Sequence, residues 1–162
     1  MIWLSIFLAV VGLALSAFFS GSETGFYRVA RVRLVLDALG GGDPVARGLL
    51  WLTNHPSLFV ATTLVGNNLA NYLVSAAIVA GTQAVVHGEN YLAELIAPIL
   101  FAPLLFVYGE LLPKNLFLHA PNRLLRRGGI FFLLCVPLFF PISWLLWVFN
   151  KALAKWLGES SE

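Results

Sequence analysis

Four long apolar runs limit what this chain can fold into. They span residues 2–26, 57–86, 92–118 and 130–149. Each run is long enough to cross the hydrocarbon core of a bilayer, which takes about 20 helical residues. Only 11% of the 162 residues are charged, and a soluble chain of this length cannot bury so much apolar surface. The sequence therefore predicts an all-α integral membrane protein that forms a single domain over residues 1–162.

The distribution of arginine indicates how the runs are oriented. Residues 27–56 contain four arginines and residues 119–129 contain three, whereas residues 87–91 contain no lysine or arginine. Basic loops stay on the cytoplasmic side. We therefore expect a multi-pass protein of the cell (inner) membrane, with its N-terminus outside and its C-terminus in the cytoplasm. The run at 2–26 lacks the positively charged start of a signal peptide, so we expect it to remain as the first span.

Two prolines, Pro137 and Pro141, interrupt the fourth run. Each removes a helix hydrogen bond and clashes with the preceding turn, and a fourth span would also place Lys151 and Lys155 outside. We therefore predict that residues 130–149 form a Pro-broken hairpin that dips into the inner leaflet and returns. An ordinary kinked fourth span is the alternative.

The inner loop at about 28–54 is expected to form a pair of short helices. The three glycines at 40–42 end the first helix, and Asp43 and Pro44 open the second as its N-cap and its first residue.

The expected fold thus has three transmembrane helices, this inner-side pair, and a Pro-broken half-membrane segment with a juxtamembrane helix at about 130–158. The amphipathic face of that last helix comprises Ala152, Leu153, Trp156 and Leu157.

A glutamate, Glu110, lies inside the third run, about 25 Å from its outer end at helical rise. A charged side chain in a span costs about 2.5 kcal/mol or more and normally faces the bundle interior. Pro113 leaves the carbonyl of Gly109 without its usual donor, so a carboxylate and a free carbonyl fall within one turn. The alternative is a glutamate near the inner membrane face, or one paired with Lys114 four residues on.

Three asparagines lie inside the second run. Asn67 and Asn71 are four residues apart and share one helix face, and Asn68 lies near Asn71. Gly66 lets the backbone approach whatever these residues contact. Asparagines in a span often only join helices through hydrogen bonds, but that alternative explains one asparagine better than three. We interpret them as candidate ligands.

A polar stretch ends the first run, at a depth similar to that of Glu110. It contains Ser20, Ser22, Glu23 and Thr24. The alternative is a helix end, in which Ser22 caps a new helix and Glu23 lies in its first turn, where the helix dipole favours it. Ser20 precedes that break and lies on the span itself, so we rank it above the other three.

The chemistry of these residues indicates what they could bind. Carboxylate, amide, hydroxyl and carbonyl oxygens suit Mg²⁺ or Ca²⁺ better than zinc, copper or iron. A single carboxylate compensates a divalent charge only partly, so we expect a weak site from which the ion can leave. The histidines have no ligand spacing and no nucleophile–base pair is present. We therefore expect neither an enzyme nor, without a basic run, a nucleic-acid partner.

The three polar stretches, in this order, resemble the transmembrane (DUF21) domain of the CorC/CorB/CNNM family of magnesium transporters. They read FSGSETGF (19–26), LVGNNLANYL (64–73) and GELLPKNL (109–116). The resemblance implies three spanning helices, a short inner helical pair, a juxtamembrane helix and a homodimer formed through this domain. The implied ion ligands are Ser20, Gly66, Asn67, Asn71, Gly109 and Glu110. Asn68 falls in a variable slot of that pattern, and Ser22 and Glu23 match it only loosely.

This resemblance also implies a function. Family members are implicated in Mg²⁺ export, proposed to be driven by Na⁺ entry. Their cytosolic CBS domains, which bind ATP, are expected after residue 162 and are absent from this sequence, so ATP binding is not expected in this chain. The alternative function is a membrane scaffold or a divalent-metal sensor whose polar network only holds the helices together. A water-accessible Glu110 would favour transport, and a sealed Glu110 bonded to Asn71 would favour the scaffold.

Overall fold

The computed structural model describes residues 1–29, 31–40, 42–86 and 91–156. Within these ranges all regular structure is helical. The elements are α1 (Ile2–Arg28), α2 (Arg31–Gly40), α3 (Pro44–Thr53), α4 (Pro56–Val85), α5 (Tyr91–Phe106), the π-helical turn η1 (Val107–Leu111), α6 (Leu112–His119) and α7 (Pro121–Trp156).

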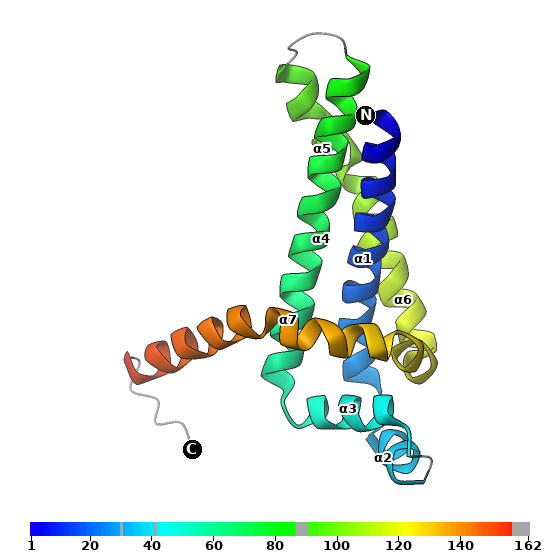
Figure 1. The fold of residues 1–162 in the computed structure, drawn as a ribbon, viewed down its shortest axis with the longest axis vertical. Coiled ribbons are helices and arrows are strands. Elements are labelled where there is room, and N and C mark those ends of the chain that lie inside the picture. The colour runs from blue at the N-terminus through cyan, green and yellow to red at the C-terminus, as the bar shows by residue number, and fades with distance from the viewer. Residues whose placement is uncertain (30, 41, 87–90, 157–162) are drawn as a thin grey trace.

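Three long columns of helix run side by side in Figure 1, formed by α1, by α4 and by α5 with η1 and α6. The short helices α2 and α3 lie at one end of the columns, and the N-terminus lies at the other. Among the described residues, four helical stretches are long and apolar enough to cross a membrane. They are Ile2–Arg28, Pro56–Val85, Tyr91–His119 and Pro121–Ile142. The all-α membrane-protein prediction is confirmed at this level.

Helix α7 corrects the prediction for the fourth run. It continues without a break from Pro121 to Trp156, so the Pro-broken hairpin over 130–149 is wrong. Figure 1 shows α7 crossing the columns near their α3 end and projecting beyond them. The expected juxtamembrane helix is the last part of α7 up to Trp156. Its predicted apolar face lies outside the described side chains, and Leu157 lies outside the described residues.

Packing explains why two prolines do not reverse this helix. Pro137 and Pro141 are four residues apart, and both are exposed on one face of α7. The residues that α7 buries lie on its other face, among them Phe132, Val136 and Phe139. A proline weakens the bonds on its own side of a helix and bends it there. Contacts along the opposite face hold the rest of the helix in line.

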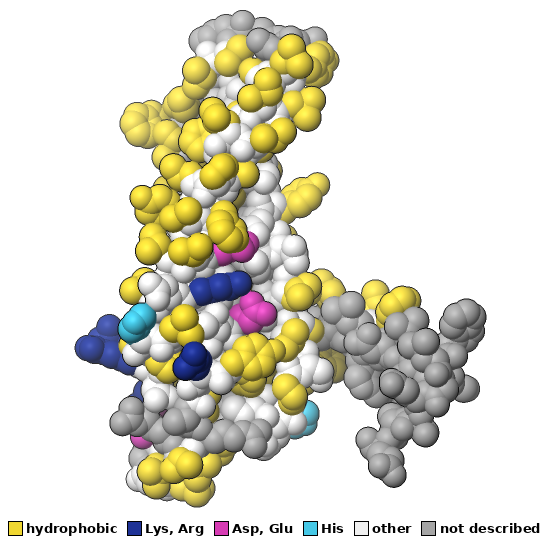
Figure 2. All heavy atoms as spheres, turned by 180° about the vertical axis from the view of Figure 1, so that it is seen from behind, with side chains coloured by type: hydrophobic (Ala, Val, Ile, Leu, Met, Phe, Trp, Pro, Cys, Tyr) yellow, Lys and Arg dark blue, Asp and Glu magenta, His cyan; other side chains and the backbone are white. Residues whose placement is uncertain are grey.

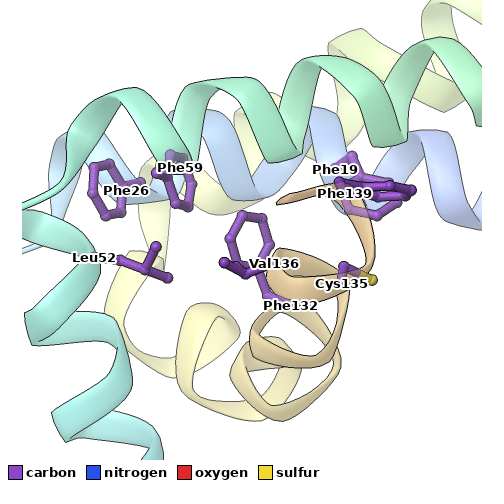
Figure 3. Close-up of a cluster of buried hydrophobic side chains, with 8 residues drawn as sticks. All are labelled: Phe19, Phe26, Leu52, Phe59, Phe132, Cys135, Val136 and Phe139. Carbon is purple, nitrogen blue, oxygen red and sulfur yellow. The ribbon is translucent and has the colours of Figure 1, made fainter. Parts of the chain in front are cut away.

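An aromatic stack joins α7 to the columns (Figure 3). Phe59 of α4 lies between two rings: its centroid is 3.6 Å from that of Phe26 in α1 and 4.7 Å from that of Phe132 in α7. Cys135 is buried in the same cluster. The interplanar angles are 9° and 22°, so the rings stack face to face. This cluster is the part of the core that sets the position of α7 across α1 and α4.

The inner helical pair has the predicted local chemistry. The Asp43 side chain caps α3 by accepting a hydrogen bond from the Val45 amide at 3.0 Å, and Pro44 opens the helix. Gly42 has a φ of 63°, a conformation that favours glycine. Asp43 also forms an ion pair with Arg126 of α7, whose Nε lies 2.8 Å from Asp43 Oδ2. The same carboxylate therefore begins α3 and ties it to α7.

Two substitutions of Asp43 separate these roles. We expect Asp43→Ala to cost about 1 to 2 kcal/mol of stability, because both the cap and the ion pair are lost. Asp43→Asn keeps a capping oxygen and loses only the charge of a partly exposed pair, so it should cost under about 1 kcal/mol. Hydrogen exchange of the α3 amides in detergent micelles measures both. Equal protection in the two variants would contradict the capping role.

Candidate ion site

Two asparagines of α4 meet a serine of α1 in the interior of the bundle. Ser16 Oγ lies 3.0 Å from Asn67 Oδ1 and 2.8 Å from Asn71 Oδ1. Ser16 is almost fully buried, and both asparagines are half-buried. The four-residue spacing that places Asn67 and Asn71 on one face of α4 therefore directs both toward α1.

These three oxygens converge with only one hydrogen between them. A serine hydroxyl has a single proton to donate, so only one of the two short contacts to Ser16 can be a hydrogen bond at a time. The other contact becomes a hydrogen bond when the Asn67 amide turns so that its Nδ2 points to Ser16. With the amides as found, three oxygens point together, and a small cation between them would supply the partner that they lack.

Glu110 of η1 joins this cluster through Asn71, whose Nδ2 donates to Glu110 Oε1 at 3.4 Å. That bond is long, and the glutamate is half-buried rather than sealed. No ion pair joins Glu110 to Lys114 in the described part of the chain, where the ion pairs that form involve Arg126. The alternative in which Lys114 neutralises Glu110 four residues away is therefore not supported by the geometry.

The third column widens at Glu110. Residues Val107–Leu111 form a π-helical turn, closed by a bond from the Leu112 amide to the Val107 carbonyl. The sequence predicted a weakened helix here because Pro113 has no amide hydrogen to donate. Gly109 is buried in this turn, and a Cβ built on it would lie 3.2 Å from Ser16 Oγ. The glycine thus lets the π turn approach the serine, and π turns often occur at functional sites.

Ser20 and Ser22 are buried, and neither hydroxyl has a hydrogen-bond partner among the described residues. A serine or threonine in a helix usually bonds back to a carbonyl of the preceding turn. In α4, Thr62 does so to Leu58 at 2.8 Å. An unmade bond costs a buried polar group about 1 to 3 kcal/mol. The two serines therefore present free oxygens inside the bundle, Ser20 one turn beyond Ser16 on the same face.

The helix-end alternative for Ser22 and Glu23 is wrong, because α1 continues through both residues to Arg28. Gly21 marks no break. A Cβ on Gly21 would lie 2.4 Å from the ring of Phe117 in α6, so this glycine serves close packing. Tertiary contacts with α6 thus extend α1 beyond the point where its sequence turns polar.

The remaining candidates lie outside the cluster. Asn68 is exposed, and its Nδ2 donates to the Leu64 carbonyl at 2.7 Å. Gly66 leaves room for the ring of Phe19, whose atoms would lie 2.6 Å from a Cβ. Glu23, Thr24 and Lys114 are half-buried and make none of the hydrogen bonds or ion pairs found between described side chains. Their predicted roles as ligands stay predictions.

Sequence reasoning missed Ser16. Its signal was present, because Ser16 lies four residues before Ser20 and therefore on the same helix face. A lone serine in an apolar run is usually a packing residue, so nothing local separates it from Ser5. What distinguishes Ser16 is the partner helix, since Asn67 and Asn71 lie opposite it.

The chemistry of the cluster is limited to oxygen. Nowhere in the described residues do three or more His, Cys, Asp or Glu side chains gather closely enough to hold a metal. Amide, hydroxyl and carbonyl oxygens with one carboxylate remain, which is a set for a hard cation. On the face shown in Figure 2, the charged side chains lie toward the α2 and α3 end, and the described residues toward the other end show hydrophobic side chains but no charged ones.

Comparison with known proteins gives one family and two curated relatives. The family described as "Cyclin M transmembrane N-terminal domain" matches residues 7–162. The chain is 30% identical over 149 residues to the "UPF0053 inner membrane protein YfjD" of Escherichia coli, covering 91% of this chain and 34% of that protein. It is 32% identical over 151 residues to a "UPF0053 protein" of Haemophilus influenzae, with 92% and 34% covered. The chain thus spans about a third of the length of these relatives.

Proposed function

Since the chain belongs to the family of cyclin M (CNNM) transmembrane N-terminal domains, we propose that it is the ion-conducting domain of a Mg²⁺ transporter. The observation that carries the proposal is the meeting of Ser16, Asn67 and Asn71 oxygens beside the π turn that holds Glu110. The proposal assigns the chain no catalytic step.

In the proposed topology three columns cross the membrane and α7 does not. The proposal puts that end in the cytoplasm and the N-terminus outside, and the arginines at 27–56 and 119–129 support this orientation. Support for α7 lying along the inner leaflet comes from its course across the columns in Figure 1 and from its many exposed apolar residues. Helix α5 buries none of its residues within the chain, which leaves a face for lipid or for a second copy in a homodimer.

Each residue of the cluster has a proposed part in holding Mg²⁺. Glu110 supplies the one negative charge, and Asn67, Asn71 and Ser16 supply neutral oxygens. Ser20 and the Gly109 carbonyl complete the set from the two neighbouring helices. One carboxylate leaves a divalent ion undercompensated, so binding is weak enough for release. Export direction and coupling to Na⁺ entry are part of this proposal through the family resemblance alone.

A second function is favoured by the hydrogen bonds themselves. Asn71 bonds Glu110, and Ser16 bonds the asparagines, so the same network could simply hold α1, α4 and η1 together in a membrane scaffold or a metal sensor. The partial exposure of Glu110 and Asn71 argues for an accessible site. The two functions differ in whether the ion binds and whether it crosses.

Two measurements on the purified chain decide between these functions. Isothermal calorimetry gives Mg²⁺ binding, with Ca²⁺ and Na⁺ as controls. Proteoliposomes that enclose a Mg²⁺-sensitive dye give flux, with and without an opposing Na⁺ gradient. Binding together with flux supports the transporter. Binding without flux identifies a sensor, and neither binding nor flux identifies a scaffold.

Replacing Ser16 tests the residue that the structure adds to the site. We expect Ser16→Ala to weaken Mg²⁺ binding about tenfold, because one oxygen ligand is removed and the asparagines lose their orienting partner. Ser5→Ala is the matched control, since Ser5 is a buried serine of the same helix that bonds only back to Met1. Calorimetry on both variants should show the loss in Ser16→Ala alone. Equal affinities would remove Ser16 from the site.

A further inference from the structure

A polar cavity lies at the cytoplasmic end of the proposed topology, between α2 and the first turns of α7. Its volume is about 460 Å³. Its lining residues are Asp37, Asn122, Arg123, Arg126 and Arg127. Three guanidinium groups and one carboxylate therefore face one space. It is separate from the ion cluster, which lies between α1, α4 and η1.

Of the three arginines that line this cavity, only Arg126 forms ion pairs with carboxylates of the described residues. Arg126 is neutralised by Asp43 at 2.8 Å and approaches Asp37 at 3.7 Å. Arg123 and Arg127 are exposed, and neither forms an ion pair within the part of the chain that the structure describes. The cavity thus has an excess of positive charge on two side chains that are free to bind an anion.

An apolar stripe continues from these two arginines along the same face of α7. Arg123 and Arg127 are four residues apart, and Phe131, Leu134 and Leu138 follow at steps of three or four residues. The three apolar side chains are exposed, by 45%, 66% and 68%. The surface of the helix therefore changes from guanidinium to hydrocarbon within one turn. Such a surface offers charge to a lipid headgroup and hydrocarbon to the acyl chain beside it.

The side-chain oxygen of Asn122 lacks a hydrogen-bond donor among the described residues. Its Oδ1 is buried and has no partner among the described residues, although Asn122 lines this cavity. An ionised phosphodiester has no hydrogen to donate to this oxygen. A headgroup that contains both a phosphate and a hydroxyl can satisfy the arginines and the amide oxygen together.

We propose that this cavity binds the headgroup of an anionic phospholipid of the phosphatidylglycerol type. Arg123 and Arg127 take the phosphodiester, Asn122 accepts from a glycerol hydroxyl, and an acyl chain lies along Phe131, Leu134 and Leu138. Basic pockets on the cytoplasmic side of membrane proteins bind such headgroups, and the planar guanidinium matches phosphate geometry. The apolar stripe favours a lipid over a soluble phosphate, because only a lipid has both a phosphate for the arginines and an acyl chain for the stripe.

Retention of lipid by the detergent-purified chain tests this proposal. The chain is incubated with phosphatidylglycerol or phosphatidylcholine, and bound lipid is counted by native mass spectrometry. We expect the parent to prefer phosphatidylglycerol, and Arg123→Gln with Arg127→Gln to reduce its retention about tenfold to thirtyfold. The matched control is Arg28→Gln with Arg47→Gln, which removes two exposed arginines from the same end but none from the cavity lining. Its retention should stay within about twofold of the parent.

Further arms separate the sources of phosphate. Inorganic phosphate at millimolar concentration should not displace the lipid, and Leu134→Gln, which leaves every arginine in place, should also reduce retention. Displacement by inorganic phosphate would identify a soluble-anion site and overturn the proposal. Equal loss in both arginine pairs, or no headgroup preference in the parent, would overturn it as well. Because neither arginine lies at the ion cluster, Mg²⁺ binding by the same variants reports on the proposed function independently.

Discussion

Replacing Glu110 with glutamine is expected to reduce Mg²⁺ affinity by at least about 100-fold, or about 2.7 kcal/mol. The substitution keeps the shape of the side chain and removes the only carboxylate of the cluster. The remaining amide and hydroxyl oxygens then face a divalent ion without compensating charge. Flux in proteoliposomes should fall with binding, because the ion no longer rests between the helices.

The Glu110→Gln variant should still fold, so a loss of Mg²⁺ binding can be assigned to the site rather than to unfolding. An ionised side chain in a span is costly, so a neutral residue at 110 should leave the protein at least as resistant to unfolding. Glu94→Gln is the matched control, because Glu94 is a half-buried glutamate near the start of the same column. Calorimetry should give the parent affinity for Glu94→Gln. A Glu110→Gln variant that binds Mg²⁺ as tightly as the parent would exclude the proposed site.

Replacing Gly12 with alanine should separate α1 from α4, which form the most extensive helix contact in the described chain. A Cβ at this position would lie 2.6 Å from Val74 Cγ2, 3.1 Å from the Val74 nitrogen and 3.2 Å from the Ala70 carbonyl. A side-chain atom can move aside, but the backbone of α4 cannot without shifting the helix. We expect a loss of about 1 to 3 kcal/mol from overpacking, which exceeds the gain of about 0.5 to 1 kcal/mol in helix propensity.

The displacement caused by this clash should also change the distances within the ion cluster. Gly12 lies one turn before Ser16, and Ala70 precedes Asn71, so separated helices lengthen the contacts between serine and asparagines. Unfolding in a denaturing detergent measures the stability, and calorimetry measures the weakened binding of Mg²⁺. Gly81→Ala is the control on α4, since the nearest atom to its added Cβ, Ser5 Cβ, would lie 3.5 Å away. Similar stability of the two variants would show that the α1–α4 contact tolerates a methyl group.

Much of the fold could be predicted because its signals are local. Hydrophobic runs of about 20 residues or more define membrane-length helices, and the helical stretches found at 2–28, 56–85 and 91–119 differ from the prediction by at most two residues at either end. Asp43 and Pro44 open α3 as expected, since capping depends only on neighbouring atoms. The asparagine spacing likewise placed Asn67 and Asn71 on one face.

Other features depend on contacts between distant residues. Ser16 joins the cluster only because α4 presents two asparagines to it. Helix α1 continues past Gly21 because the ring of Phe117 fills the space beside that glycine. Helix α7 stays continuous through two prolines because its opposite face packs against Phe59 and its neighbours. Local rules predicted a break in the fourth run and offered one at Ser22 as the alternative, and packing outweighed them at both places.

By itself, the sequence determined the class of the protein, the length of its spans and the oxygen chemistry available to an ion. These follow from the transfer of apolar side chains into lipid and from the donor atoms that each residue type offers. The tertiary structure decided which oxygens meet, where the third column widens, and that α7 crosses the bundle as one helix. Those outcomes are set by close approach between helices, where a glycine or an aromatic ring on one helix fixes the position of another.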